Sequence, residues 1–246
     1  MLSKRLARVL ALSVVAAGAA ACGEAPAPGA APIAVAAITE NSLMANSLMA
    51  NSLMANSLIA KTLATANAST PQFMKYLVSC ALGPNQSLDL TISGQPYHFP
   101  GQVGLAPQWG MSGGSCDGSC QRWVSACLLA RLDAAGVERE ISVRGLHPAL
   151  LPSWSELTTY TQREATYFGN VFIPGQPRYL CLPPGAKSDQ RVCGDSLSDC
   201  PVTVIPNCAP DCLFQGLFGD YDICSDSGHK GSGTTYLESV TVFLPK

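Results

Sequence analysis

The chain has 246 residues, with 15 Lys and Arg against 17 Asp and Glu and a formal net charge of −2 at pH 7. Lys4, Arg5 and Arg8 are three of the basic residues, so the rest of the chain is more acidic, and it contains no basic run. This balance argues against nucleic acid as a partner and against electrostatic binding to anionic lipid.

Residues 1–21 have the features of a secretory signal peptide. The three basic residues form its start, and the apolar stretch 9–17 follows them. This stretch is too short to cross a membrane as a helix, and no stop-transfer pattern comes after it. We therefore expect an exported protein from which residues 1–21 are removed.

Residues 19–22, with the sequence AAAC, resemble the lipobox of bacterial lipoproteins, although Ala19 stands where that family usually has Leu. The resemblance implies that Cys22 becomes the lipidated first residue of the mature chain, with a membrane as its partner through this lipid anchor. Gly23 implies retention at the outer membrane, where the protein would face the periplasm or the cell surface. Ordinary cleavage after Ala21 is the alternative, and it would give a secreted protein.

Two low-complexity segments follow. Residues 22–40 are rich in Ala and Pro and predict an extended tether. Residues 41–65 repeat every five positions: NSLMA begins at 41, 46 and 51, NSLIA at 56 and KTLAT at 61. A leucine at every fifth residue matches neither the helical nor the strand period, so we expect a disordered or short-repeat stalk. Such repeats after a lipoprotein signal resemble those of predicted envelope proteins of large-genome Gram-negative bacteria, an uncharacterised group.

The folded, Cys-rich domain is expected at residues 70–246. The pattern of residues 70–80, with Pro71 in the first turn, predicts a helix. The alternation of apolar and polar residues in 87–92 predicts a strand, and residues 97–99 are expected to be its partner.

A second helix is predicted within residues 114–136, where apolar and Cys positions follow the spacing of one helical face. Asp117 and Ser119 can cap its start, and Gly136 can end it. This helix is expected to be the centre of the core.

The second half of the domain is predicted to contain one more helix and several strands. Residues 154–168 are expected to be helical, because Ser153 and Glu156 have the spacing of a capping box. Strands are expected at residues 137–143, 179–182, 202–205 and 236–244. The predicted fold class is α+β, a small disulfide-stapled domain with about three helices and an antiparallel sheet.

The chain has 11 cysteines, and assigning Cys22 to a lipid leaves an even number. In an exported chain this predicts five disulfides rather than a metal site, although C-x3-C spacing occurs twice. Cys120 and Cys127 lie about 10.5 Å apart along one helix, too far to bond to each other. We expect the pairs Cys116–Cys120 and Cys80–Cys127. The pairing of the other six is left open: Cys181, Cys193, Cys200, Cys208, Cys212 and Cys224.

A G-x-S-x-G sequence centred on Ser112 raises the alternative of a small secreted serine hydrolase. Its base would be His229, and its acid Asp222 or a neighbouring Asp. A small disulfide-bonded esterase such as a cutinase has a similar size. The context disfavours this reading, because no clear strand precedes Ser112 and the predicted helix does not follow it at once. We therefore expect a loop here and lean against an enzyme.

Asp220, Asp222 and Asp226 are weak calcium ligand candidates, since closely spaced carboxylates near Gly228 could supply hard oxygen atoms. The spacing departs from an EF-hand loop, and Asp-rich turns are common without metal. We expect no other metal and no cofactor.

Together these features favour a cell-envelope lipoprotein with a disulfide-stabilised binding or structural domain. Its ligand, a protein or a glycan, is not specified by the sequence.

Overall fold

The computed structural model describes residues 70–111, 114–184, 186, 190–195, 200–213, 216–229 and 231–246. The predicted signal peptide, Cys22, the tether and the pentad repeat lie outside these residues. Among the described residues, no helix combines the length and apolar character needed to cross a membrane.

The predicted first helix and hairpin are confirmed as α2 (Thr70–Ala81), β1 (Ser87–Ile92) and β2 (Gln95–Pro100). The strands pair antiparallel around Ser93 and Gly94, whose φ angles of 51° and 82° suit a tight two-residue turn. The apolar face of this hairpin lies against α2, which buries most of its side chains.

The predicted central helix is confirmed as α3 (Gly118–Ala130). Its N-cap is Asp117, whose side chain accepts a hydrogen bond of 2.9 Å from the Cys120 N–H. The helix ends at Ala130, several residues before Gly136, which has a φ of 65° in the turn that follows. Buried α3 residues and α2 belong to one hydrophobic core.

A five-stranded sheet packs against α3 in the order β3-β10-β4-β5-β6. All its neighbouring strands are antiparallel except β5 and β6, which are parallel. A second, three-stranded sheet has the order β7-β8-β9. The bounds are β3 (Ser142–Arg144), β4 (Tyr160–Gly169), β5 (Arg178–Cys181), β6 (Thr203–Ile205), β7 (Cys212–Leu213), β8 (Asp222–Ser225), β9 (Thr235–Tyr236) and β10 (Ser239–Pro245).

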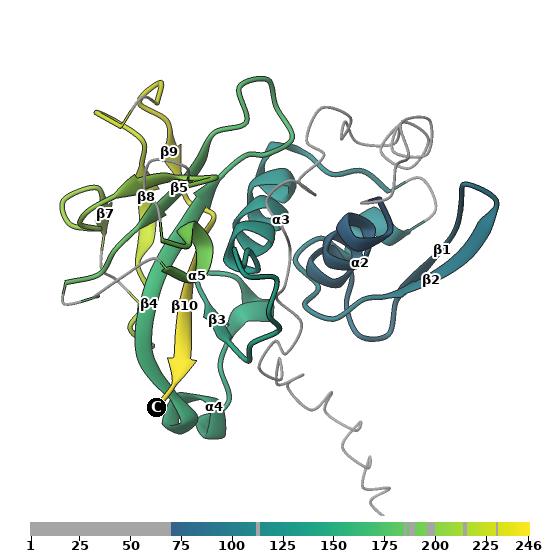
Figure 1. Cartoon of the computed structure of the whole chain (residues 1–246), viewed down its shortest axis with the longest axis horizontal. Helices are drawn as coiled ribbons and strands as arrows, with labels where there is room; N and C mark the ends of the chain where they lie inside the picture. Colours follow the sequence, from purple (N-terminus) through teal and green to yellow (C-terminus); the bar gives the residue numbers. More distant parts are fainter. Residues whose placement is uncertain are drawn as a thin grey trace, which may run out of the picture. The chain divides into compact units, whose positions relative to one another are not determined.

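The two faces of the five-stranded sheet serve different cores. Tyr167 and Leu180 belong to the core around α3, whereas their neighbours Phe168 and Tyr179 belong to a smaller core with Tyr236. This follows from the two-residue period of a strand. In Figure 1, α3 accordingly lies beside β4 and β10, and the β7-β8-β9 sheet lies on the side away from α3.

The helix expected at residues 154–168 is wrong beyond its first turns. Only α4 (Trp154–Thr159) is helical, and β4 begins at Tyr160. The capping box is confirmed, with Glu156 N–H donating to Ser153 Oγ at 3.2 Å and Glu156 Oε2 accepting from Ser153 N–H at 3.3 Å. Pairing with both β10 and β5 makes β4 an inner strand, and this tertiary pairing overrides the local helical pattern.

The strand expected at residues 137–143 is also largely wrong, because Val137 and the three residues after it are exposed and outside any strand. The structure adds short elements that the sequence did not predict: α5 (Gln190–Cys193), the 3-10 helices η4 (Pro107–Gly110) and η5 (Pro148–Leu150), and strands β7 and β8. The α+β class itself is confirmed.

Five disulfides join the ten cysteines of the domain. Both predicted pairs, Cys80–Cys127 and Cys116–Cys120, are confirmed. The other three are Cys181–Cys208, Cys193–Cys200 and Cys212–Cys224.

Candidate functional site

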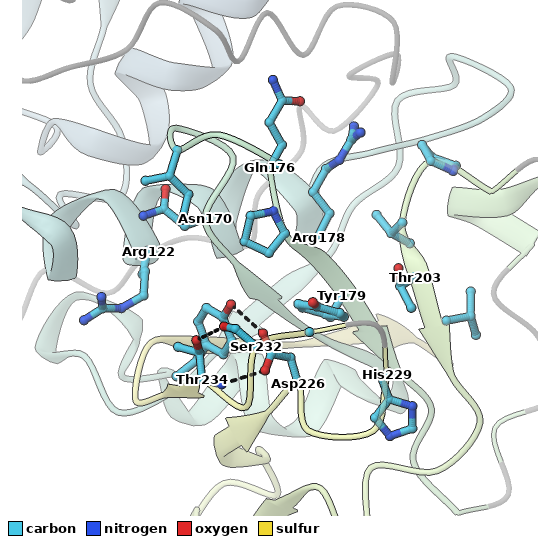
Figure 2. A pocket seen from close by; sticks show the side chains of 18 of the residues that line it. Arg122, Asn170, Gln176, Arg178, Tyr179, Thr203, Asp226, His229, Ser232 and Thr234 are labelled. Carbon is cyan, nitrogen blue, oxygen red and sulfur yellow. Dashed lines mark hydrogen bonds between the residues drawn. The ribbon is translucent and has the colours of Figure 1, made fainter.

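A groove of about 1090 Å³ lies where the β4–β5 loop, the β6 segment and the β8–β9 hairpin meet (Figure 2). Apolar residues such as Ile173 and Val204 line part of it. Its polar lining comprises Arg122, Asn170, Gln176, Arg178, Thr203, Asp226, His229, Ser232 and Thr234. This mixture of apolar wall and convergent polar groups is typical of ligand sites.

The first wall is the β4–β5 loop. Gly169 has a φ of 137°, and a Cβ there would lie 2.1 Å from the Pro177 carbonyl oxygen, so only glycine allows the close strand approach. The Asn170 N–H donates to the same carbonyl at 2.8 Å. At the tip, Gln176 has a φ of 43°, a conformation that non-glycine residues rarely adopt and that occurs often at functional sites.

The second wall is the β6 segment, and disulfides hold both of its ends. Cys200 before the strand is bonded to Cys193, and Cys208 after it is bonded to Cys181 on β5. Between them only three residues form the strand. Covalent links therefore hold a wall that regular secondary structure alone would hold weakly.

The third wall is the β8–β9 hairpin, organised by the buried Asp226 carboxylate. Its oxygens accept hydrogen bonds from the Thr234 N–H at 2.7 Å and the Tyr236 hydroxyl at 3.1 Å. Burial, and then the charge of Asp226, raise the pKa of Tyr236, so its phenol stays protonated and donates this bond. A Cβ at Gly231 would lie 2.1 Å from Asp226 Cγ, so the hairpin needs glycine there.

Arg122 reaches the groove from α3 and forms a two-bond ion pair with Glu238 (N···O 2.6 and 2.9 Å). The Ser119 hydroxyl donates to the same carboxylate at 2.6 Å. Burial alone would raise the pKa of Glu238, but the hydrogen bonds from Arg122 and Ser119 outweigh it and hold this pKa below its ordinary value. The ion pair joins α3 to the segment that leads into β10.

His229 lies between β8 and β9 and lines the groove (Figure 2), and its Nε2 is 2.9 Å from Asp211 Oδ2. Both side chains are partly exposed. Asp211 therefore orients the imidazole in this region.

Arg178 differs from the other charged groups of the groove. Its guanidinium makes no hydrogen bond, ion pair or ring contact with the described residues. It is half-buried, and this burial lowers its pKa, although an arginine remains charged at neutral pH. Among the described residues that line the groove, Arg178 is thus the charged side chain without a partner.

The residues predicted for a hydrolase are not assembled as a triad by the described chain. Ser112 lies outside the described residues. His229 is paired with Asp211, whereas Asp222 is buried beside Asp220, and neither Asp222 oxygen has a hydrogen-bond partner among the described residues. Burial, followed by the nearby Asp220 charge, raises the pKa of Asp222 to about 7.

The calcium candidates are likewise only partly brought together. Asp220 and Asp222 are neighbours, but Asp226 uses its oxygens inside the β8–β9 hairpin. The calcium hypothesis therefore rests on Asp220 and Asp222.

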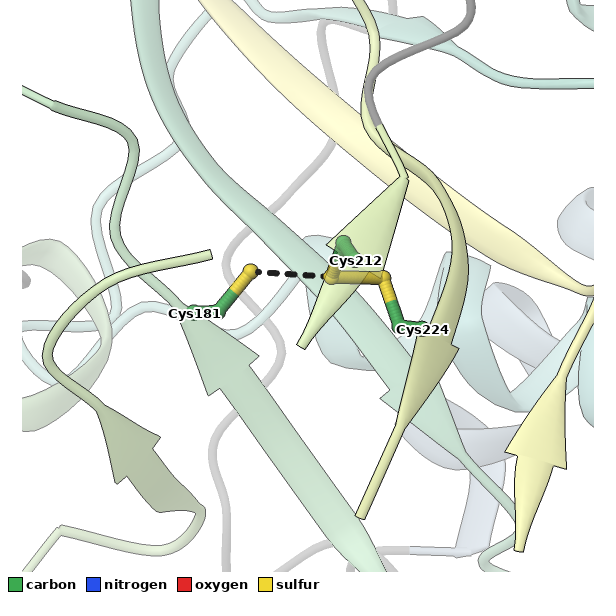
Figure 3. A group of neighbouring side chains, drawn as sticks. All are labelled: Cys181, Cys212 and Cys224. Atoms are coloured by element: carbon green, nitrogen blue, oxygen red, sulfur yellow. Dashed lines mark hydrogen bonds between the residues drawn. A yellow bond between two sulfur atoms is a disulfide. The ribbon is translucent and has the colours of Figure 1, made fainter. Parts of the chain in front are cut away.

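Among the described residues, one group of three metal-ligating side chains has all its ligand atoms within 4.8 Å of one another: Cys181, Cys212 and Cys224. Cys181 Sγ is 3.5 Å from Cys212 Sγ, as Figure 3 shows. These sulfurs belong to the disulfides Cys181–Cys208 and Cys212–Cys224, and thiolates rather than disulfide sulfurs bind metal. The oxidised cluster is a covalent core beside the groove.

Sequence reasoning missed most of the groove. It identified His229 and Asp226, but not Arg178, Asn170 or Asp211. One feature of the sequence could have indicated Arg178. It is a single arginine at the start of the otherwise apolar strand RYLC, directly after a Gly- and Pro-rich loop.

Comparisons with family models, curated proteins and solved structures found no match to this chain. Its function must therefore be argued from the groove and from the covalent framework around it.

Proposed function

We propose that this protein is an exported, lipid-anchored component of the cell envelope and that its disulfide-stapled domain binds a ligand in the groove beside β5 and β6. The five disulfides are consistent with a stabilised domain in an oxidising extracellular or periplasmic compartment. The observation that carries the binding role is the groove itself, whose three walls are held in place before any ligand arrives.

The contacts inside the groove support a preformed binding site. Arg122 is held by Glu238, His229 by Asp211, and the Asp226 carboxylate by Thr234 and Tyr236. These pairings restrict the side chains, so a ligand would pay little ordering entropy at the protein surface. This arrangement favours recognition, in which rigid polar groups select a ligand.

The proposed lipid anchor is supported by the disulfide pattern. All ten cysteines from Cys80 to Cys224 are paired, which leaves Cys22 as the cysteine available for lipidation. We expect intact-mass spectrometry of the protein from its native host to show a chain that begins at an acylated Cys22. The variant C22S should lose the acyl mass and leave the membrane fraction. An unacylated amino terminus, or wild-type protein that still carries residues 1–21, would contradict the anchor.

Binding in the groove can be tested by blocking it. Ser232 is exposed and lines the groove, whereas Ser227 is exposed on the same hairpin and lies outside the groove lining. In a thermal-shift screen of envelope saccharides and peptides, we expect at least one ligand to raise the melting temperature of wild type and of S227W but not of S232W. Ligand-induced shifts that all survive in S232W would place binding elsewhere.

A serine hydrolase that uses Ser112 and His229 is the second candidate, because a carboxylate-oriented imidazole is the arrangement of a general base. The orienting acid in that case is Asp211. A fluorophosphonate probe that labels wild type at Ser112, and fails to label H229A, would establish the hydrolase. Absence of labelling in wild type would leave the binding role.

A further inference from the structure

We infer that the groove recognises an oxyanion of its ligand, a carboxylate or phosphate group, through the guanidinium of Arg178. This inference rests on the binding function proposed above and adds the chemical class of the group that is bound. It follows from the position of Arg178 and from the pairing of the other charged side chains that line the described groove.

The described part of the chain uses its other arginines structurally. Each has a hydrogen bond or a ring contact to another described residue: Arg122, Arg131, Arg139, Arg144, Arg163 and Arg191. Arg178 has none, although it is half-buried. A half-buried guanidinium is stabilised when an oxyanion pairs with it, so its position in the wall of the groove points to a partner supplied by the ligand.

The pairing of the charged groups leaves the guanidinium of Arg178 available to a ligand. Arg122 is paired with Glu238 and His229 with Asp211, and the Asp226 carboxylate accepts hydrogen bonds from its own hairpin. An anion that enters the groove can therefore pair with Arg178 without breaking an ion pair among the described residues.

Two amide side chains, Asn170 and Gln176, line the same groove as Arg178. Figure 2 shows the Gln176 and Arg178 side chains extending to the same side from the end of the β4–β5 loop. The Asn170 amide nitrogen donates a long hydrogen bond of 3.3 Å to Gln121 at the same edge. A guanidinium can give two parallel hydrogen bonds to one oxyanion, and neighbouring amides can select the body to which it is attached.

Calorimetric titration of the purified, oxidised protein tests this inference with three probes. Glucuronate carries a carboxylate, inorganic phosphate is a free phosphate, and glucose is the neutral match of glucuronate. We expect glucuronate or phosphate to bind wild type at least about tenfold more tightly than glucose does, and binding to weaken as salt is added. The stronger of the two anions identifies which oxyanion the groove prefers.

Three variants locate the effect. R178Q should weaken anion binding about 10- to 100-fold, and R178K should weaken it less, because lysine keeps the charge and loses the two-bond geometry. R163Q removes a charge outside the groove lining and should bind anions as wild type does. R178Q should not lower the melting temperature, since the guanidinium has no partner among the described residues to lose, and a clear drop would mean that Arg178 is structural.

The outcomes separate this inference from the proposed binding function. Anion binding that R178Q leaves unchanged, or glucose binding as tight as glucuronate binding, overturns the oxyanion inference. If S232W blocks the binding of the anion or of glucose in either case, the groove remains a binding site. If neither anion binds wild type at up to about 10 mM, the oxyanion inference also fails, and the saccharide and peptide screen with S232W alone decides the binding function.

Discussion

The two cores of this domain are built by different means. The core around α3 consists of side chains from α2, α3 and one face of the five-stranded sheet. The helical spacing of apolar residues directs the side chains of the two helices into this core. The smaller core has three stacked or tilted rings, Phe168, Tyr179 and Tyr236, and four buried cysteines between very short strands. Disulfides and aromatic contacts can thus replace regular secondary structure, and the groove lies on the region where they do so.

Removing the central ring of the smaller core should have the largest effect. Phe168 is fully buried, with ring centroids 5.2 Å from Tyr179 and 5.5 Å from Tyr236. We expect F168A to lower the free energy of unfolding by about 4 kcal/mol, because it leaves a cavity and removes both ring contacts. Chemical denaturation measures this change. F168L should cost clearly less, and an equal loss in both variants would show that ring volume is not what stabilises this core.

The disulfides allow a direct comparison between the cores. The double variant C181A/C208A opens a link across 27 residues in the smaller core, and C116A/C120A opens one across four residues at the start of α3. From loop entropy we expect losses of about 3.5 and 2 kcal/mol respectively in unfolding experiments. The first variant should also loosen β6 and weaken binding in the groove. If C116A/C120A proves the more costly, covalent links are not the main support of the smaller core.

The buried acid pair should give a smaller, pH-dependent effect. The folded-state pKa of Asp222 is raised from an ordinary 3.8 to about 7, so the folded state holds a proton that the unfolded state releases. Stability contributed by this group is therefore greatest below about pH 4 and falls as the pH rises towards 7. By linkage this shift corresponds to a decline of about 3 kcal/mol between pH 4 and 7, and we expect D222N to remove most of it when free energies of unfolding are compared at the two pH values.

The melting temperatures of wild type and D222N can also be compared with and without calcium. If Asp220 and Asp222 bind the ion, millimolar calcium should raise the melting temperature of wild type at pH 7 and not that of D222N. A calcium effect that persists in D222N would place the ion at other residues.

How well the sequence predicted the fold follows the same division between the two cores. The structure confirms α3, which was predicted from helical spacing, and its cap Asp117. It also confirms the pairs Cys80–Cys127 and Cys116–Cys120. These predictions depended on short sequence patterns and on helix geometry. β4 was missed because its identity as an inner strand depends on pairing with β10, about 75 residues further along the chain.

The groove could not be predicted for a similar reason. Its walls come from three separate segments, and the key property of Arg178 is the absence of a described partner, which only the folded chain reveals. The sequence singled out His229 as a possible general base, but its partner Asp211 lies in a turn with no motif of its own. Pairing among Cys181, Cys208, Cys212 and Cys224 likewise depends on which strands meet, not on spacing in the sequence.

Disulfide mapping of protein purified from the native host tests the central claim most directly. Non-reducing peptide mass spectrometry should recover the five linked pairs seen here, including Cys181–Cys208 and Cys212–Cys224, with no reactive thiol after denaturation. Two or more free thiols among these ten residues, or a different set of pairs around β6, would contradict the view that oxidation outside the cytoplasm builds the groove.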